Sequence, residues 1–397
     1  SLYLNFRKSK KYYLYKSTNM KQIYILLIAL LMGLSANAET SGTCGPHLRW
    51  HFTDNGVLTI SGKGKMYDYS FYNRAPWGKY NIKRIIKRII IGDGITTIGS
   101  RAFYTCSALI SVTIPNSVTE IGDRAFEGCS ALTSVTIPNS VTTIGEGAFV
   151  DCRLTSVTIP NSVTKIGDRA FEGCSALTSV TIPNSVTKIS DLAFARCSAL
   201  TSVNIPNSVT EIGSSAFDWC ERLTSISIPN SVTEIGSSAF EDCRSLTSVT
   251  IPNSVTKISN LAFCLCVSLT SVTIPNSVKN IGSLAFFKCT NITQISSEAV
   301  VPPICEPNVF DDINKSECKL IVPKNSLDAY KQADQWKDFF LIEGSTTGIT
   351  NTVYNKAGLA DVYTIDGTKR LSKASTDEIN ALPKGVYIVN GKKIIIK

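Results

Sequence analysis

Histidine is nearly absent from the 397-residue chain, which contains only His47 and His51. A Gly-rich phosphate loop, a Gly-x-Ser-x-Gly motif and paired Cys-x-x-Cys motifs are also missing. Hydrolytic triads, nucleotide-phosphate sites and structural zinc sites depend on such groups. The two histidines fall in a segment that reads as a strand, where they lie roughly 13 Å apart at about 3.3 Å per residue. We therefore expect no enzyme, no cofactor and no metal site.

Long apolar runs are equally scarce. The longest, Ile23–Leu34, is too short to span a bilayer. It follows Met20 and Lys21 and precedes Ala36-Asn37-Ala38, which is the pattern of a secretory signal peptide. We expect residues 20–38 to be that signal peptide, residues 1–19 to be translated upstream sequence, and no stable transmembrane segment to remain after cleavage. Export through the signal peptide predicts a secreted or outer-cell-surface protein.

The net charge is modest once this leader is set aside. The chain carries a formal charge of +9, and six of its basic residues, with no acid, lie in residues 1–38. The remainder therefore carries +3, which gives no electrostatic footprint for nucleic acid.

What the sequence has in abundance is an internal repeat. Nine units of about 23 residues run from residue 92 to 297, and one unit is a residue shorter. Each unit combines strand alternation, such as Val135 and Ile137, with a Pro-Asn-Ser turn, a second short apolar piece and a short helical or irregular turn at Ala148-Phe149. Periods of 20–29 residues with leucine-type positions predict a leucine-rich repeat solenoid, β-dominated α/β, in which stacked coils share one core. The missing residue of the short unit falls in the turn after Cys152, at Arg153, so we expect the strands to stay in register.

The cysteines follow the same period. Nine of the thirteen lie three residues after a core phenylalanine: Cys106, Cys129, Cys152, Cys174, Cys197, Cys220, Cys243, Cys266 and Cys289. Free cysteine behaves as a small buried hydrophobe, which favours a ladder of reduced thiols over disulfides or a metal site. Cys264 reads as a surface substitution. Cys305 and Cys318 stand outside the ladder, and whether they are bridged stays open.

The flanks read as caps followed by a tail. Residues 39–91 contain a hairpin pattern around Asp54-Asn55-Gly56 and form the expected N-terminal cap. Residues 298–343 form the C-terminal cap, with a helix expected over 325–340 and capped by Asn325 or Ser326. Residues 344–349 have linker composition, and residues 350–397 carry two hairpin signals of a small C-terminal β-domain.

The unit L-x-x-V-x-I-P-x-S-V-x-x-I-G-x-x-A-F-x-x-C resembles the BspA-like leucine-rich repeat surface proteins of bacteria, and the flanks "SGTCGPHLRWHFTDNGVLTISGKGKMYDY" and "CKLIVPKNSLDAYKQADQWKDFF" match that family over about residues 41–342. The tail, with "DVYTIDGTKRL" and "LPKGVYIVNGKKIIIK", resembles the C-terminal sorting domains of type IX secretion substrates but is shorter than most of them. The resemblance implies a cell-surface adhesin that binds host or bacterial surface macromolecules. It supplies no catalytic residues.

Internal variation indicates where recognition occurs. The outward strand positions hardly vary and are nearly all Ser and Thr, whereas the residues around each ladder cysteine differ from unit to unit. Aromatic and arginine residues are typical of binding hot spots. The candidate binding residues are Trp219, Arg196, Arg222, Arg244, Phe287 and Leu265.

Three functional hypotheses stay open. The first is macromolecular binding, in particular of a protein, through these variable residues. The second is a passive structural or spacer module of the cell envelope with no specific ligand. The third is carbohydrate binding through the uniform Ser/Thr face. Neutral drift at exposed sites is the alternative explanation of the variation, and coil stacking is the alternative explanation of the hydroxyl rows.

Overall fold

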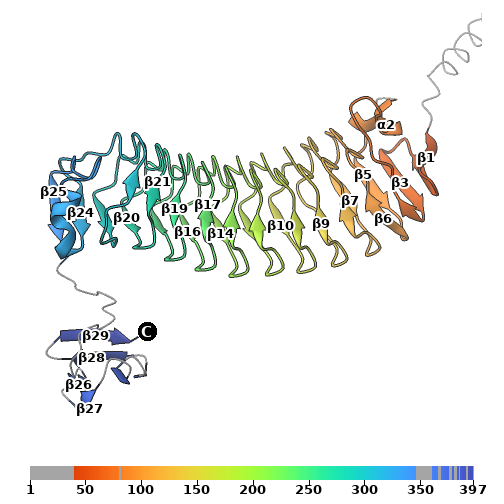
Figure 1. Ribbon diagram of the computed structural model, residues 1–397. Coiled ribbons are helices and arrows are strands. Elements are labelled where there is room, and N and C mark those ends of the chain that lie inside the picture. Colours follow the sequence, from red (N-terminus) through yellow and green to blue (C-terminus); the bar gives the residue numbers. More distant parts are fainter. Residues whose placement is uncertain are drawn as a thin grey trace, which may run out of the picture.

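The computed structural model describes residues 40–79, 82–345, 360–364, 368–374, 378–379, 382–383, 385–389 and 392–396. The expected upstream sequence, signal peptide and linker lie outside them, apart from Gly344 and Ser345. The described repeats form an elongated solenoid whose coils stack side by side along one axis (Figure 1). The predicted leucine-rich repeat solenoid is confirmed.

Each coil contributes up to two short strands, and equivalent strands of successive coils pair in parallel. The first column of strands comprises β5 (Arg88–Ile91), β7 (Ser111–Thr113), β10 (Ser156–Thr158), β12 (Ser179–Thr181), β14 (Ser202–Asn204), β16 (Ser225–Ser227), β18 (Ser248–Thr250), β20 (Ser271–Ile274), β22 (Gln294–Ser297) and β24 (Lys319–Val322). In β10, β12, β16, β18 and β20 the central Val or Ile is buried and the flanking Ser and Thr are exposed, as the alternation predicts.

The second column follows the Pro-Asn-Ser turn. It comprises β4 (Gly64–Lys65), β6 (Ile95–Ile98), β8 (Glu120–Ile121), β9 (Thr143–Ile144), β11 (Lys165–Ile166), β13 (Lys188–Ile189), β15 (Glu211–Ile212), β17 (Glu234–Ile235), β19 (Lys257–Ile258), β21 (Asn280–Ile281) and β23 (Ile304–Cys305). The nine predicted coils supply β6 to β21. The cap regions supply β4 and β23, so the solenoid has about eleven turns. The caps are therefore coils themselves.

The N-terminal cap contains the predicted hairpin. Strands β1 (Ser41–Gly45), β2 (Leu48–Phe52) and β3 (Val57–Gly62) are antiparallel neighbours, and Phe52 pairs with Leu58 around the turn. Gly56 has a φ of 85°, which glycine adopts without a steric penalty. Because β3 then pairs in parallel with β5, the hairpin covers the first edge of the first sheet column. The short helices α2 (Pro76–Lys79) and η1 (Ile82–Arg84) lie between β4 and β5.

The helix predicted over 325–340 is wrong in length. Only η2 (Lys324–Ser326) and α3 (Leu327–Tyr330) are helical, and Ser326 makes no side-chain capping hydrogen bond. Gln335 has a φ of 62°, which ends any helical path, and its Oε1 accepts a bond of 2.8 Å from the Val309 amide. Trp336 is buried and donates to the Pro303 carbonyl at 2.8 Å. Contacts with the last coil thus override the local helix propensity.

The chain leaves this end through β25 (Leu341–Gly344), which extends the first column in parallel with β24. The tail forms a separate antiparallel sheet in the order β27 (Lys369–Ala374), β26 (Ala360–Thr364), β28 (Gly385–Val389) and β29 (Lys392–Ile396). It has its own small core, which includes Val362, Ile379 and Val389. The expected small C-terminal β-domain is therefore present.

A column of stacked phenylalanine rings runs through the solenoid core. It contains Phe103, Phe126, Phe149, Phe171, Phe194, Phe217, Phe240, Phe263, Phe286 and Phe310. Successive ring centroids lie 5.3–6.1 Å apart, and Trp77 and Trp336 continue the column at its two ends. The segment that follows each ring is a turn, so the short helix allowed by the sequence does not form there.

The ladder cysteines lie beside these rings as buried, free thiols. From Cys129 onward each Sγ donates to the carbonyl of the phenylalanine in the preceding coil, over 3.1–3.3 Å. The thiol therefore fills apolar space and adds a weak hydrogen bond between coils. Cys264 is 2 % exposed, so its assignment to the surface is wrong. Cys305 and Cys318 are also free cysteines in the structure, which does not show a bridge between them.

We expect these nine thiols not to react with a thiol reagent in the native protein. Burial raises the pKa of Cys106 and of Cys197 to about 12, so almost no reactive thiolate exists at pH 8. Thiol counting should recover all thirteen cysteines in denaturant and none of the nine ladder thiols before it is added. Rapid reaction of most of the ladder in native buffer, or its isolation in oxidised form, would contradict this packing.

The short unit is accommodated where the sequence predicts. In the other repeats the Leu or Ile three residues after the cysteine donates its amide to the cysteine carbonyl, as Leu132 does to Cys129 at 2.9 Å. Leu154 makes no such bond within the described residues, because one residue of this turn is missing. Strand register is kept, since Thr136 pairs with Thr158 and Val157 pairs with Val180.

Hydroxyl groups also bond between coils. The threonine that precedes each first-column strand donates from Oγ1 to the carbonyl of its equivalent one coil earlier, over 3.1–3.4 Å from Thr155 to Thr293. Before the second column, the same bond is made by Thr119, Thr142, Thr164, Thr210 and Thr233. These repeated hydroxyls stabilise the stacking of the coils.

Candidate functional site

The variable residues around the ladder cysteines occupy a turn in which some side chains, such as Trp219, are exposed and others, such as Ala195 and Asp242, are buried. We define the variable stripe as the residues that lie one or two positions before or after a ladder cysteine, between Ala195 and Lys288. The residue before each cysteine has a left-handed backbone: φ is 60° at Arg196, 58° at Trp219 and 60° at Leu265. Glycine holds the same position at Gly128 and Gly173. The backbone shape is thus a property of the coil, and its side chain is free to vary.

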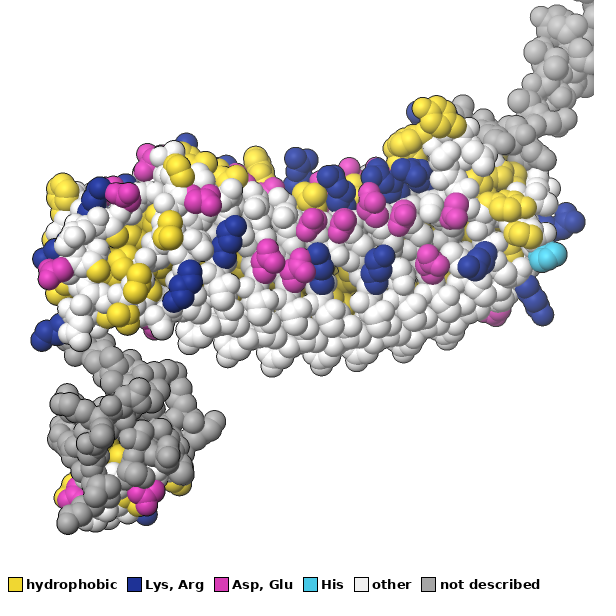
Figure 2. All heavy atoms as spheres, in the orientation of Figure 1, with side chains coloured by type: hydrophobic (Ala, Val, Ile, Leu, Met, Phe, Trp, Pro, Cys, Tyr) yellow, Lys and Arg dark blue, Asp and Glu magenta, His cyan; other side chains and the backbone are white. Residues whose placement is uncertain are grey.

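Hydrogen bonds between coils fix the spacing of the stripe. The amide of Arg196 donates to the Asp218 carbonyl at 2.7 Å, and the amide of Trp219 donates to the Glu241 carbonyl at 2.9 Å. Leu265 donates in the same way to Phe287 at 2.8 Å. Side chains at this position therefore follow one another at about the strand spacing of 4.8 Å. Figure 2 shows charged side chains in rows along the length of the solenoid.

Trp219 is the exposed aromatic of the stripe. Its side chain is 44 % exposed, whereas Trp50, Trp77 and Trp336 are each at most 1 % exposed. It stands between exposed Arg196 on the preceding coil and buried Asp242 on the following one. The structure thus brings Arg196 and Trp219 together, as the repeat register predicts.

Arg244 takes part in an ion pair, which sequence reasoning missed. Its Nε and Nη2 donate to the two carboxylate oxygens of Asp242, the second bond being 3.3 Å long. Asp242 is only 2 % exposed, while the Arg244 side chain is about half exposed. The guanidinium is therefore held beside the Trp219 coil and keeps an open face toward solvent.

The other predicted residues are less closely associated. Arg222 is exposed beyond Cys220, and neither a hydrogen bond nor an ion pair joins it to Trp219 within the described residues. Leu265 and Phe287 are half-buried neighbours two and three coils away. The Lys288 ammonium lies 5.2 Å from the Phe287 ring centroid, a cation–π contact. Phe287 sits one position earlier in its coil than Leu265 does, so the two belong to adjacent rows.

One carboxyl group of the stripe, that of Asp218, has a raised pKa. Asp218 is half-buried, and its Oδ1 has no hydrogen-bond partner in the part of the chain that the structure describes. Desolvation, then the nearby carboxylates of Glu241 and Asp242, raise the pKa of Asp218 to about 7, against the opposing effect of Arg196. Asp218 therefore changes charge close to neutral pH, directly before Trp219.

This pKa gives a stability prediction with a definite sign. The folded state holds the Asp218 proton up to about pH 7, whereas the unfolded chain releases it near pH 4. The free energy of unfolding should fall as pH rises between those values. Asp218→Asn should abolish this fall in the free energy of unfolding. It should stabilise the protein at pH 8 by about 1–2 kcal/mol, a figure reduced because Asp218 is partly exposed to solvent, and should give no stabilisation at pH 4. Urea unfolding at the two pH values measures it, and an equal effect at both would contradict the assignment.

Over residues 40–79 and 82–345 and the described parts of the tail, no group of three or more potential ligands is placed to hold a metal ion. His47 and His51 are both exposed. No helix in those same segments has the length and apolar character needed to cross a membrane.

Comparison with known proteins identifies the repeat. The family model for the BspA type leucine rich repeat region matches residues 96–223 and 210–325, in six copies. No curated protein sequence matches the chain. Among solved structures, a leucine-rich repeat protein from Eubacterium ventriosum is 23% identical, with 76% of this chain and 92% of that chain covered and a TM-score of 0.44.

Two further solved structures are similar. A leucine-rich repeat protein from Bacteroides ovatus is 26% identical, with 76% and 99% coverage and a TM-score of 0.41. A leucine rich cell surface protein from Faecalibacterium prausnitzii is 27% identical, with 66% and 96% coverage and a TM-score of 0.34. The family model, which matches more than half of the chain and the very coils described above, decides the assignment: the chain belongs to the BspA type leucine-rich repeat family.

Proposed function

We propose that the solenoid recognises a macromolecular partner, specifically a protein, through the variable stripe centred on Trp219. The observation that carries the proposal is the exposure of Trp219, at 44 %, in a chain whose other tryptophans are buried. The coil does not need an indole at this position, because Gly128 and Gly173 occupy it elsewhere with the same backbone shape. Large aromatic side chains of this kind supply a major share of binding energy in protein interfaces.

The surroundings of Trp219 support a protein ligand. Arg196 lies on one side, and the Arg244–Asp242 pair lies on the other. Leu265 and Phe287 add partly exposed apolar surface further along. An aromatic anchor with arginines around it is the composition enriched at interface centres, and its irregularity from coil to coil suits an irregular partner. A surface that is identical in every coil lacks this information.

The exposed Ser/Thr face remains the basis of a second candidate function, carbohydrate binding. Ser179 and Thr181 are exposed and equivalent to residues in most other coils, so the face suits a repetitive ligand. The neighbouring threonine rows bond between coils, which gives the abundance of hydroxyls a structural explanation. A passive spacer with no ligand is the remaining alternative.

The setting we propose for this binding is the bacterial cell surface. BspA-type repeat proteins are typically surface proteins, and leucine-rich repeat solenoids are typically non-catalytic interaction modules. Export by the signal peptide of residues 20–38 and sorting by the type IX-like tail stay predictions. Host or bacterial surface macromolecules are the partners we infer, in an adhesin-like role.

A pull-down with the purified protein tests the proposal. The bait is presented to extracellular-matrix proteins, to bacterial surfaces and to a glycan array, with Trp219→Ala as a second bait. We expect a protein to be retained by the unaltered bait and depleted from the variant. Retention of glycans alone would favour the Ser/Thr face, and indifference to every ligand would favour the spacer.

A further inference from the structure

A pocket of about 230 Å³ lies at the N-terminal end of the solenoid, and none of its lining residues belongs to the variable stripe. Residues 66–79 and 82–87, between β4 and β5, fold over the first repeat there and contribute Ser70, Phe71, Arg74, Trp77 and Lys83, while the repeat contributes Arg101 and Tyr104. Figure 1 shows α2, part of this segment, projecting beyond the row of coils. The pocket is thus built from two parts of the chain that the fold brings together.

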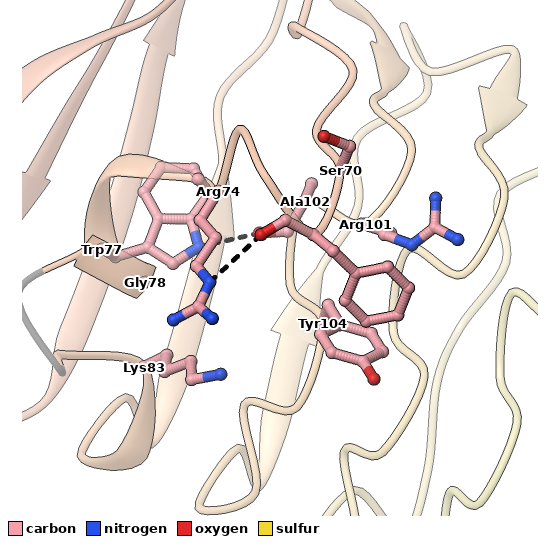
Figure 3. Close-up of a pocket in the computed structure, with 10 residues that line it drawn as sticks. Ser70, Arg74, Trp77, Gly78, Lys83, Arg101, Ala102 and Tyr104 are labelled. Carbon is pink, nitrogen blue, oxygen red and sulfur yellow. Dashed lines mark hydrogen bonds between the residues drawn. The ribbon is translucent and has the colours of Figure 1, made fainter.

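The pocket is basic. Arg74, Lys83 and Arg101 line it, and no carboxylate does. Within residues 40–79 and 82–345, none of the three forms a salt bridge. Arg74 donates from Nε to the Phe71 carbonyl at 3.4 Å, which leaves its terminal nitrogens available. In Figure 3 the side chains of Arg74 and Lys83 are drawn on one side of the pocket and that of Arg101 on the other.

The pocket also has aromatic walls. The rings of Phe71 and Tyr104 meet edge to face with centroids 5.6 Å apart, and buried Trp77 forms the base through a bond of 2.7 Å to the Ala102 carbonyl. Phe71 is 54 % exposed. The Arg101 guanidinium lies 5.0 Å from the Phe71 ring centroid and holds that ring in place, and its Nε is buried without a partner among the described residues. Lys83 is positioned by a bond of 2.7 Å to Thr105 Oγ1.

We propose that this pocket binds an acidic sugar residue, a saccharide ring that carries a carboxylate or sulfate. Arg74 and Lys83 receive the acidic group, because guanidinium and ammonium groups pair with oxyanions. Phe71 and Tyr104 pack against the apolar face of the ring. The volume is below the range of about 300–1,000 Å³ that suits drug-sized ligands, and so fits a single ring. An acidic peptide side chain would use the cations but leave the aromatic walls empty.

This site is independent of the proposed function of the stripe, and the test keeps them apart. The full-length protein is titrated calorimetrically with sialyllactose, a heparin-derived disaccharide, neutral lactose and penta-glutamate. We expect saturable binding of at least one acidic saccharide, and lactose binding weaker by about ten-fold or more. Trp219→Ala should bind the saccharides as the unaltered protein does.

Variants locate the binding. Lys83→Ala and Arg74→Ala should each weaken acidic-saccharide binding about ten-fold. Phe71→Ala removes an exposed ring without touching the core and should also weaken it. Lys165→Ala, which removes an exposed charge from β11, is the matched control and should change nothing.

Three results would overturn the proposal: no saturable binding of either acidic saccharide at millimolar concentration, equal or tighter binding of penta-glutamate, or unchanged affinity in both cation variants when circular dichroism shows them folded.

Discussion

Phe194→Ala should lower the free energy of unfolding by about 3–5 kcal/mol. The ring is fully buried and stacked between Phe171 and Phe217, at centroid distances of 5.5 and 5.6 Å. The amide of Phe194 is bonded to the Ala216 carbonyl at 2.9 Å, so the backbone spacing between coils is fixed. The neighbouring rings therefore cannot close the cavity that the substitution leaves.

The matched control for this prediction is Trp219→Ala, which removes a larger ring from an exposed position. Its effect on urea-induced unfolding should stay within about 0.5 kcal/mol. Comparable costs for the two variants would contradict the view that the phenylalanine column, and not the surface turn, holds the coils together.

Trp219→Ala should weaken binding of the captured partner by at least about 1–2 kcal/mol. The substitution leaves the core residues Phe217 and Cys220 untouched, so the solenoid that presents Arg196 and Arg244 should persist. Titration of the partner against the folded variant measures the loss.

Thr181→Val is the control on the strand face, where it removes one exposed hydroxyl and keeps the side-chain shape. It should change the affinity little. A clear loss for Thr181→Val beside an unchanged affinity for Trp219→Ala would move the site to the hydroxyl face and favour a repetitive ligand.

Much of the fold could be predicted because the sequence repeats, so that the local preferences of each unit agree with the packing of the whole solenoid. The core Phe and the ladder Cys recur at one position in every unit, so a single unit predicts the core of the repeats. Even the defect at Arg153 could be located, since Val157 and Ile159 keep their alternation on either side of Thr158. The same logic placed Arg196 and Trp219 on adjacent coils.

The features that the sequence did not predict correctly lie where the repeat ends or where the contacts do not follow its period. The segment 331–340 has helix-forming residues, but Trp336 is drawn into the end of the core and Gln335 adopts a left-handed conformation. Cys264 looked exposed because it lies outside the cysteine register, yet it is buried. The Asp242–Arg244 ion pair and the left-handed turns depend on side-chain and backbone geometry, which the sequence pattern does not predict.

The basic pocket was missed for a related reason. Its residues are separated by about one coil in sequence and meet only because residues 66–79 and 82–87 fold over the first repeat. One signal was present, the aromatic-rich run "YDYSFY" at 67–72 within the N-terminal cap. Its two most exposed rings, Phe71 and Tyr72, mark that end of the molecule.

The intrinsic fluorescence of the protein offers the most direct test of the stripe. Trp219 is the exposed tryptophan of the four, so acrylamide should quench one fraction of the emission readily and the buried remainder slowly. With the captured partner at saturation, we expect the accessible fraction to disappear and the emission to shift to shorter wavelength. An accessible fraction that stays fully quenchable in the saturated complex would contradict recognition through Trp219.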